Sequence, residues 1–342
     1  MRNFKGWIVV SAATGINLIL GLLYIWSIMS KALVKELGWT STEASLPYTV
    51  CTAVFAIVMV FAGKIQDIRG PRLTSTFGGI LLGGGLILSS LTNNPLVMVL
   101  TFGVLGGAGI GFCYAATTPS ALKWFSIQKK GLISGIVVSG VGFAAVYISP
   151  LTNSLLLSYG ISRTFLYLGI GAIIILVVLS QLLFDAPSTN PAKSAVPAEK
   201  NKTSVSDNKR DLGWKEMVKT LNFYKLWIMY AFTSSAGLMI IGHIANIANM
   251  QAQWENGYLL VVLLAIFNTS GRIIGGFVSD KLGHLNTMRV IFLLQAVNMA
   301  FFGQYLSTGT LSLGVAVAGL CYGALFSVFP AATAELYGIK NL

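Results

Sequence analysis

Arg272 and Asn268, four positions apart, are the side chains of this sequence that are best suited to bind a ligand. Arg272 lies in the stretch from Phe267 to Gly276, inside an apolar run that is long enough to cross a bilayer. Its planar guanidinium can hold a carboxylate through two parallel hydrogen bonds. Asn268, one turn earlier, shares its helix face. Together these two residues predict a binding site for a small anion.

The position of Arg272 within the apolar run makes a functional role the favoured interpretation. A charged side chain at the centre of a membrane helix costs at least about 3 kcal/mol unless it faces a polar interior. All 11 acidic residues of the chain lie in loops or at the ends of the apolar runs, so none is placed to neutralise Arg272. The alternative is a structural arginine that pairs with helix carbonyls.

A histidine and several aromatic residues are weaker candidates for the same site. His243 lies well inside another apolar run, where it could donate to a substrate or carry a proton near neutral pH. A histidine that is hydrogen-bonded within a helix bundle is the stronger alternative. Tyrosine hydroxyls can point into a wet cavity, although most membrane aromatics only pack. The aromatic candidates are Tyr24, Trp26, Tyr114, Tyr147 and Tyr322.

Other chemistries find little support in the sequence. The three cysteines show no Cys-x-x-Cys spacing, and we interpret them as small buried hydrophobic residues. No Walker motif or cluster of nucleophilic, acid–base or metal-binding residues stands out, so we expect neither an enzyme nor a cofactor or metal. A membrane-embedded enzyme would need such a cluster, and a membrane sensor would need a folded soluble output domain.

The composition indicates a protein that crosses the membrane many times. Hydrophobic residues make up 55% of the 342 residues, charged residues make up 10%, and the mean hydropathy is +0.75. We therefore expect an all-α membrane protein. Ten segments are long and apolar enough to span a bilayer: roughly 7–30, 44–64, 73–91, 96–121, 132–158, 162–184, 223–248, 257–279, 288–306 and 311–333.

The basic residues predict an orientation for these segments. With the N-terminus in the cytoplasm, only Lys31, Lys35 and Arg163 fall outside, and nearly all of the other Lys and Arg residues fall inside. This placement accounts for the net charge of +12 without a nucleic-acid partner. We expect a multi-pass protein of the cell membrane that functions as a monomer.

The chain divides into two halves that carry a related loop. We predict a six-helix bundle at 1–185, a polar cytoplasmic linker at 186–219, and an incomplete four-helix bundle at 220–342. A Gly-x-x-x-Asp-x-x-Gly pattern follows the second predicted span and recurs after the eighth, which indicates parallel repeats. A tight turn with chance charges is the alternative. The loop residues are Gly63, Asp67, Arg69, Gly70 and Arg72 in the first copy, and Gly276, Asp280 and Gly283 in the second.

This paired loop resembles the signature loop of the major facilitator superfamily. The resemblance implies two helical bundles around a central cavity, and a loop aspartate that meets a helix N-terminus in the opposite half. Asp280 should then meet the fifth span, and Asp67 the eleventh. By the repeat, spans eleven and twelve are missing, so ten of twelve expected helices would be present.

Further segments resemble the oxalate–formate antiporter family. They are Gly21–Ser27, Ala236–His243, Cys321–Pro330, Glu335–Gly338 and the Gly-Arg pair at Arg272. The resemblance implies that Arg272 binds the carboxylate of the substrate, and it strengthens Tyr24, Tyr114 and Tyr147 as cavity residues. The expected function is transport of a small carboxylate such as oxalate, formate or lactate by alternating access, with anion exchange as the preferred mode. The alternatives are a truncated, inactive carrier and a proton-coupled monocarboxylate symporter.

Overall fold

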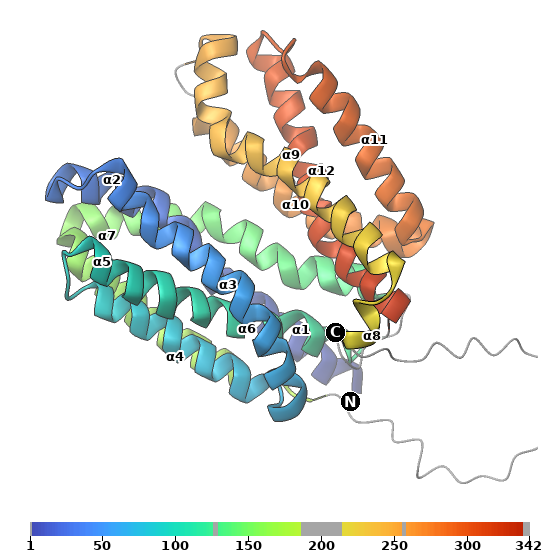
Figure 1. Cartoon of the computed structure of the whole chain (residues 1–342), viewed down its shortest axis with the longest axis horizontal. Coiled ribbons are helices and arrows are strands. Elements are labelled where there is room, and N and C mark those ends of the chain that lie inside the picture. Colours follow the sequence, from blue (N-terminus) through green and yellow to red (C-terminus); the bar gives the residue numbers. More distant parts are fainter. Residues whose placement is uncertain (1, 126–128, 186–213, 255–257, 338–342) are drawn as a thin grey trace, which may run out of the picture.

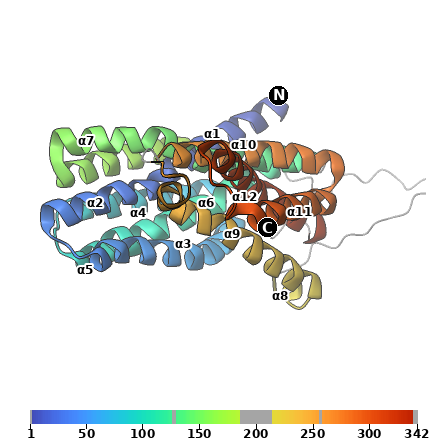
Figure 2. The same ribbon diagram turned by 90° about the horizontal axis from the view of Figure 1, so that it is seen from above.

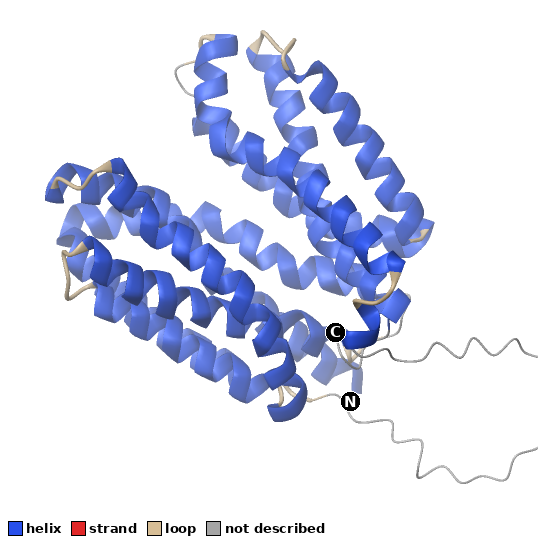
Figure 3. Ribbon diagram, viewed as in Figure 1, coloured by secondary structure: helices blue, strands red, loops and turns tan. Residues whose placement is uncertain are grey.

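The computed structural model describes residues 2–125, 129–185, 214–254 and 258–337. Within these ranges the chain is built of helices joined by short loops, and no strand occurs (Figure 3). This agrees with the expected all-α class, since helices satisfy their own backbone hydrogen bonds in lipid.

The helices form two bundles that diverge from a common end near the two termini (Figure 1). The first bundle contains α1 (Arg2–Leu20), η1 (Gly21–Ile25), α2 (Trp26–Leu37), α3 (Ser41–Arg69), α4 (Pro71–Ser89), α5 (Pro95–Met98), η2 (Val99–Gly106), α6 (Gly107–Leu122) and α7 (Lys130–Gln181). The second contains α8 (Trp214–Met217), α9 (Leu221–Ala252), α10 (Tyr258–Leu282), α11 (His284–Phe302) and α12 (Thr308–Tyr337). The linker predicted at 186–219 falls mostly outside the described residues.

Eight helical segments of the described chain are long and apolar enough to cross a membrane. The predicted count of ten is therefore not confirmed. The predicted spans at 73–91 and 223–248 correspond to α4 and α9, which are not among the eight. In α4 a basic residue, Arg72, and several Gly, Ser and Thr residues dilute the apolar ones.

Two predicted spans, 132–158 and 162–184, run together as the single helix α7. The helical conformation is interrupted at Gly160, whose φ of 76° and ψ of 179° suit glycine far better than other residues. The two candidate membrane spans in this region are Lys130–Ile148 and Pro150–Gln181, and the second of them runs across Gly160. The chain turns at Gly160 without a conventional loop.

The two signature loops have the same backbone conformation. Gly70 (φ 82°, ψ 164°) precedes α4, and Gly283 (φ 84°, ψ 150°) precedes α11. Both lie in a region that is open almost only to glycine. The recurrence at matching positions is the structural counterpart of the repeat in the sequence.

The bundles meet where α10 and α12 pack against α7. Gly276 of α10 lies so close to Gly131 of α7 that a Cβ atom on either residue would collide with the other's backbone. Seen from above in Figure 2, α10 and α12 lie near the middle of the molecule, with α2 and α5 at one end and α11 toward the other. Buried hydrophobic residues form one cluster in the first bundle and two in the second. The contact between α7 and α10 thus joins two separately packed bundles.

Candidate functional site

Arg272 lies on α10 at the contact between the bundles and is only 2% exposed. Its Nη1 donates to the backbone carbonyl of Val138 on α7 at 2.6 Å, and its Nε donates to Oδ1 of Asn268 at 3.2 Å. The guanidinium carbon lies 4.7 Å from the centre of the Phe326 ring on α12, within cation–π range. Arg272 therefore links three helices from both bundles.

Glycines of α7 make room for this arginine. A Cβ on Gly135 would collide with the Arg272 backbone carbonyl, and one on Gly142 would lie 3.3 Å from Arg272 Nε. The small residues that the sequence places along the fifth span thus let α10 approach closely enough for the guanidinium to reach the Val138 carbonyl.

The charge of Arg272 is held by neutral oxygens. Among the described residues no carboxylate forms a salt bridge with it, and no hydrogen bond engages its Nη2. A buried cation in a low-dielectric interior is stabilised strongly by an anion. The carbonyl bond matches the structural alternative raised from the sequence, while Nη2 keeps donors that no hydrogen bond among the described residues uses.

The other predicted site residues divide between the bundles. Tyr322 of α12 packs edge-on against Phe326, with ring centres 5.1 Å apart, and so shares that ring with Arg272. Tyr147 donates to the carbonyl of Leu18 at 2.9 Å, and Tyr114 packs against Phe55, so the contacts shown for both lie within the first bundle. The side chains of Tyr24 and His243 lie outside the described part of the structure.

Sequence reasoning missed several polar and aromatic residues near the junction of the two bundles. Phe326, which covers the guanidinium, looked like any other apolar residue of its span. Asn17 of α1 is buried, donates to the Val137 carbonyl at 2.8 Å and accepts from the Thr117 hydroxyl at 3.3 Å. Amide and hydroxyl residues inside otherwise apolar spans were the available signal.

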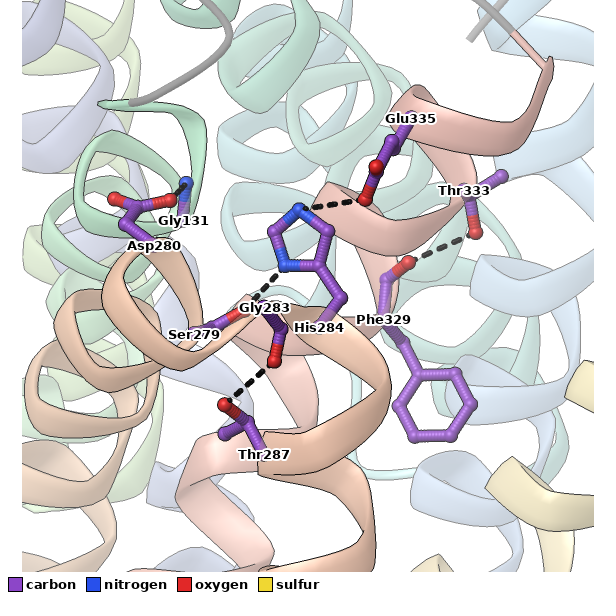
Figure 4. A network of polar contacts seen from close by, with 9 residues as sticks. All are labelled: Gly131, Ser279, Asp280, Gly283, His284, Thr287, Phe329, Thr333 and Glu335. Carbon is purple, nitrogen blue, oxygen red and sulfur yellow. Dashed lines mark hydrogen bonds and ion pairs between the residues drawn. The ribbon is translucent and has the colours of Figure 1, made fainter.

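The second signature loop docks on the first bundle. Asp280 accepts hydrogen bonds from the backbone N–H groups of Gly131 and Leu132, both at 2.8 Å, at the start of α7. Figure 4 shows the bond to Gly131. A carboxylate at a helix N-terminus is stabilised by the unpaired N–H groups and the helix dipole. This is the contact expected between Asp280 and the fifth span.

The first signature loop makes different contacts. Asp67 faces Lys123 at the end of α6, with 3.6 Å between Oδ1 and Nζ. Arg72 donates from Nε to the Leu183 carbonyl at 3.3 Å and lies over the Phe184 ring at 4.6 Å. Gly63 faces open space, and Arg69 is exposed. The contact predicted for Asp67 with an eleventh span stays a prediction.

A polar chain extends from the second loop to the end of α12 (Figure 4). His284 Nδ1 is hydrogen-bonded to Ser279, and its Nε2 lies 3.4 Å from Oε2 of Glu335. Serine, histidine and a carboxylate in this order also occur in hydrolytic triads. Here Ser279 is 1% exposed, so its hydroxyl is closed to a substrate. These polar contacts connect the turn between α10 and α11 to α12.

The family model for the Major Facilitator Superfamily matches residues 8–341. The chain belongs to this superfamily. The resemblance inferred from the two signature loops is thereby confirmed, and the protein is a multi-pass membrane protein with the fold of the superfamily.

Curated members of the superfamily align over most of this chain. An "Uncharacterized MFS-type transporter YhjX" from Escherichia coli is 27% identical over 339 residues, which is 98% of this chain and 82% of that protein. An "Oxalate:formate antiporter" from Oxalobacter formigenes is 27% identical over 325 residues, which is 94% of this chain and 75% of that protein. This chain is therefore similar to an antiporter of small carboxylates, as the sequence motifs indicated.

A solved structure of the superfamily supports the same fold. The structure of the proton:xylose symporter XylE superposes with a TM-score of 0.69 at 12% identity, covering 100% of this chain and 84% of that one. At this identity the similarity concerns the arrangement of the helices alone.

Proposed function

We propose that this protein is a secondary transporter that carries a small organic carboxylate across the cell membrane by alternating access, with anion exchange as its mode. The observation that carries the proposal is Arg272, a buried cation at the junction of the bundles whose described hydrogen bonds go to neutral oxygens. A carboxylate would supply the missing negative charge and use the guanidinium donors that are not engaged.

The bond between Arg272 and Val138 gives this binding a mechanical consequence. The bond crosses from α10 to α7, and so from one bundle to the other. A carboxylate that takes Nη1 as part of a bidentate pair displaces the Val138 carbonyl. Substrate binding then releases one of the contacts that hold the bundles together, which couples the binding of the anion to their relative movement.

The remaining predicted residues have supporting roles in this proposal. Asn268 orients the guanidinium through its bond to Nε. Tyr322 narrows the cavity on the side of Phe326. The residues assigned to cavity walls and closure from the first bundle and from α9 are Tyr24, Tyr114, Tyr147 and His243.

The signature loops hold the transporter closed on its cytoplasmic side. Asp280 holds the start of α7, and this contact must open when the cavity faces the cytoplasm. The loop residues assigned to this movement are Gly63, Asp67, Arg69, Gly70, Arg72, Gly276, Asp280 and Gly283. Gly70 and Gly283 keep the turns in a conformation that other residues seldom adopt.

The proposal is tested by uptake of labelled lactate, formate and oxalate into proteoliposomes. We expect Arg272→Gln to lower uptake of the transported anion at least about a hundredfold, because a charge-assisted bidentate contact is lost. Uptake that requires a carboxylate inside the vesicles indicates exchange, and uptake driven by a proton gradient alone indicates symport.

Arg289→Gln is the matched control, since Arg289 is exposed on α11 and contacts only Asn286 among the hydrogen bonds described for it. It should transport like the unmodified protein. Unchanged uptake by Arg272→Gln, with normal insertion and monodispersity, would refute the assignment of Arg272 to the carboxylate.

A further inference from the structure

Tyr230 and Ser234, two hydroxyl-bearing residues of α9, add a second polar element to the surroundings of Arg272. Ser234 is 9% exposed, and its Oγ has no hydrogen-bond partner among the described residues. Tyr230 lies four residues, or about one turn, earlier on the same helix and therefore shares the helix face of Ser234. A buried hydroxyl without a partner is unfavourable, so this position is suited to a polar group from outside the protein.

Tyr230 lies beside the proposed carboxylate site. Tyr230 packs edge-on against Phe326, with ring centres 6.3 Å apart, and the guanidinium of Arg272 lies over the same ring. Tyr230 also interacts electrostatically with Arg272. The guanidinium of Arg272 and the phenol ring of Tyr230 therefore both contact the ring of Phe326.

The position of α9 is set by close packing one turn further along. A Cβ on Gly237 would collide with the ring of Tyr322. The absence of a side chain at Gly237 lets α9 approach α12 closely, on the side of α9 where Tyr230 contacts Phe326.

We infer that Tyr230 and Ser234 determine substrate specificity, and that the substrate is a short monocarboxylate with an oxygen on the adjacent carbon, a 2-hydroxy or 2-oxo acid. This inference rests on the proposed function. Arg272 takes the carboxylate, and the two hydroxyls take the neighbouring oxygen. Because hydroxyls both donate and accept, they suit a hydroxyl or a keto group equally. They bring no positive charge, so they do not favour a second carboxylate.

The test compares lactate with propionate, which differs from it by the absence of the 2-hydroxyl. Binding of each acid to the purified protein is measured by calorimetry, with pyruvate and oxalate as further probes. We expect lactate and pyruvate to bind at least about tenfold more tightly than propionate, because a site built to pair a hydroxyl discriminates against the analogue that lacks it. Ser234→Ala and Tyr230→Phe should each reduce this ratio several-fold and leave propionate affinity unchanged.

Ser235→Ala is the matched control, because Ser235 is exposed and its hydroxyl bonds to the Phe232 carbonyl of its own helix. Ser234→Thr retains a hydroxyl at position 234 and shows whether any change in Ser234→Ala comes from the loss of that hydroxyl. Equal binding of lactate and propionate by the unmodified protein overturns the inference, as does an equal loss of both in the variants. Oxalate binding that is tighter than lactate binding and insensitive to both substitutions also overturns it. If the folded protein binds none of these acids, the proposed function fails.

Discussion

The oxygens around Arg272 are a carbonyl and an amide, which stabilise a cation without neutralising it. This arrangement keeps the guanidinium oriented while its charge remains available to an anion. Asn268 is central to it, since an amide oxygen accepts from Nε without competing as a full negative charge. The same position occupied by a carboxylate would produce a buried ion pair instead.

Asn268→Asp should therefore abolish most carboxylate binding. The new carboxylate would form an ion pair with Arg272 and neutralise its charge. We therefore expect the affinity for the transported anion to fall at least about tenfold, or ~1.4 kcal/mol. Asn268→Ala removes the orienting bond alone and should have a smaller effect. Calorimetric titration of both variants distinguishes the cases, and equal losses would contradict a purely electrostatic role of the substitution.

At the scale of elements, the junction of α7 and α10 depends on the lack of side chains at its closest point. Gly131 and Gly276 bring the two backbones together, which places the N–H groups of Gly131 and Leu132 within reach of Asp280. The hydrogen bonds of Asp280 depend on the close approach of α7 and α10, because they are formed only when the two helices touch.

Gly276→Ala should separate α7 from α10 and lower the stability of this conformation by about 1–3 kcal/mol, the usual cost of overpacking. The matched control is Gly84→Ala in the middle of α4, where no atom lies within 4 Å of the added Cβ. The midpoint of thermal unfolding in detergent measures both. A midpoint for Gly276→Ala that equals or exceeds that of the control would show that the contact does not stabilise the fold.

At the scale of the molecule, both termini and α8 lie at one end, while α2 and α5 lie at the other (Figure 1). The end with the termini carries the signature loops and, among the described residues, most of the basic ones, so we propose that it faces the cytoplasm. The bundles touch at this end and diverge toward the other, an arrangement that would open the proposed transporter to the outside.

Single cysteines at opposite ends test this orientation in intact cells. We expect Asn93→Cys, between α4 and α5, to react with a membrane-impermeant maleimide from outside, and Lys281→Cys to react only after permeabilisation. Both positions are exposed. The three native cysteines are buried, so the unmodified protein should stay unlabelled. The reverse pattern of labelling would place the N-terminus outside.

The membrane class, the approximate positions of most helices and the superfamily could be predicted from the amino-acid sequence alone. These properties depend on local hydropathy, on charge placement and on a loop pattern that is read within a few residues. Arg272 was found in the same way, because a charge in an apolar run is visible without any partner. Asp280 was assigned its helix partner from the family resemblance.

The surroundings of Arg272 could not be predicted from the sequence and became visible in the packed structure. The Val138 carbonyl, the Phe326 ring and the hydroxyl pair on α9 come from helices far apart in the chain, and no local pattern distinguishes them from their neighbours. The turn at Gly160, which interrupts α7 without a polar loop, was likewise missed as a feature of the backbone. Packing between helices selects such contacts through shape and distance, which a single sequence does not encode locally.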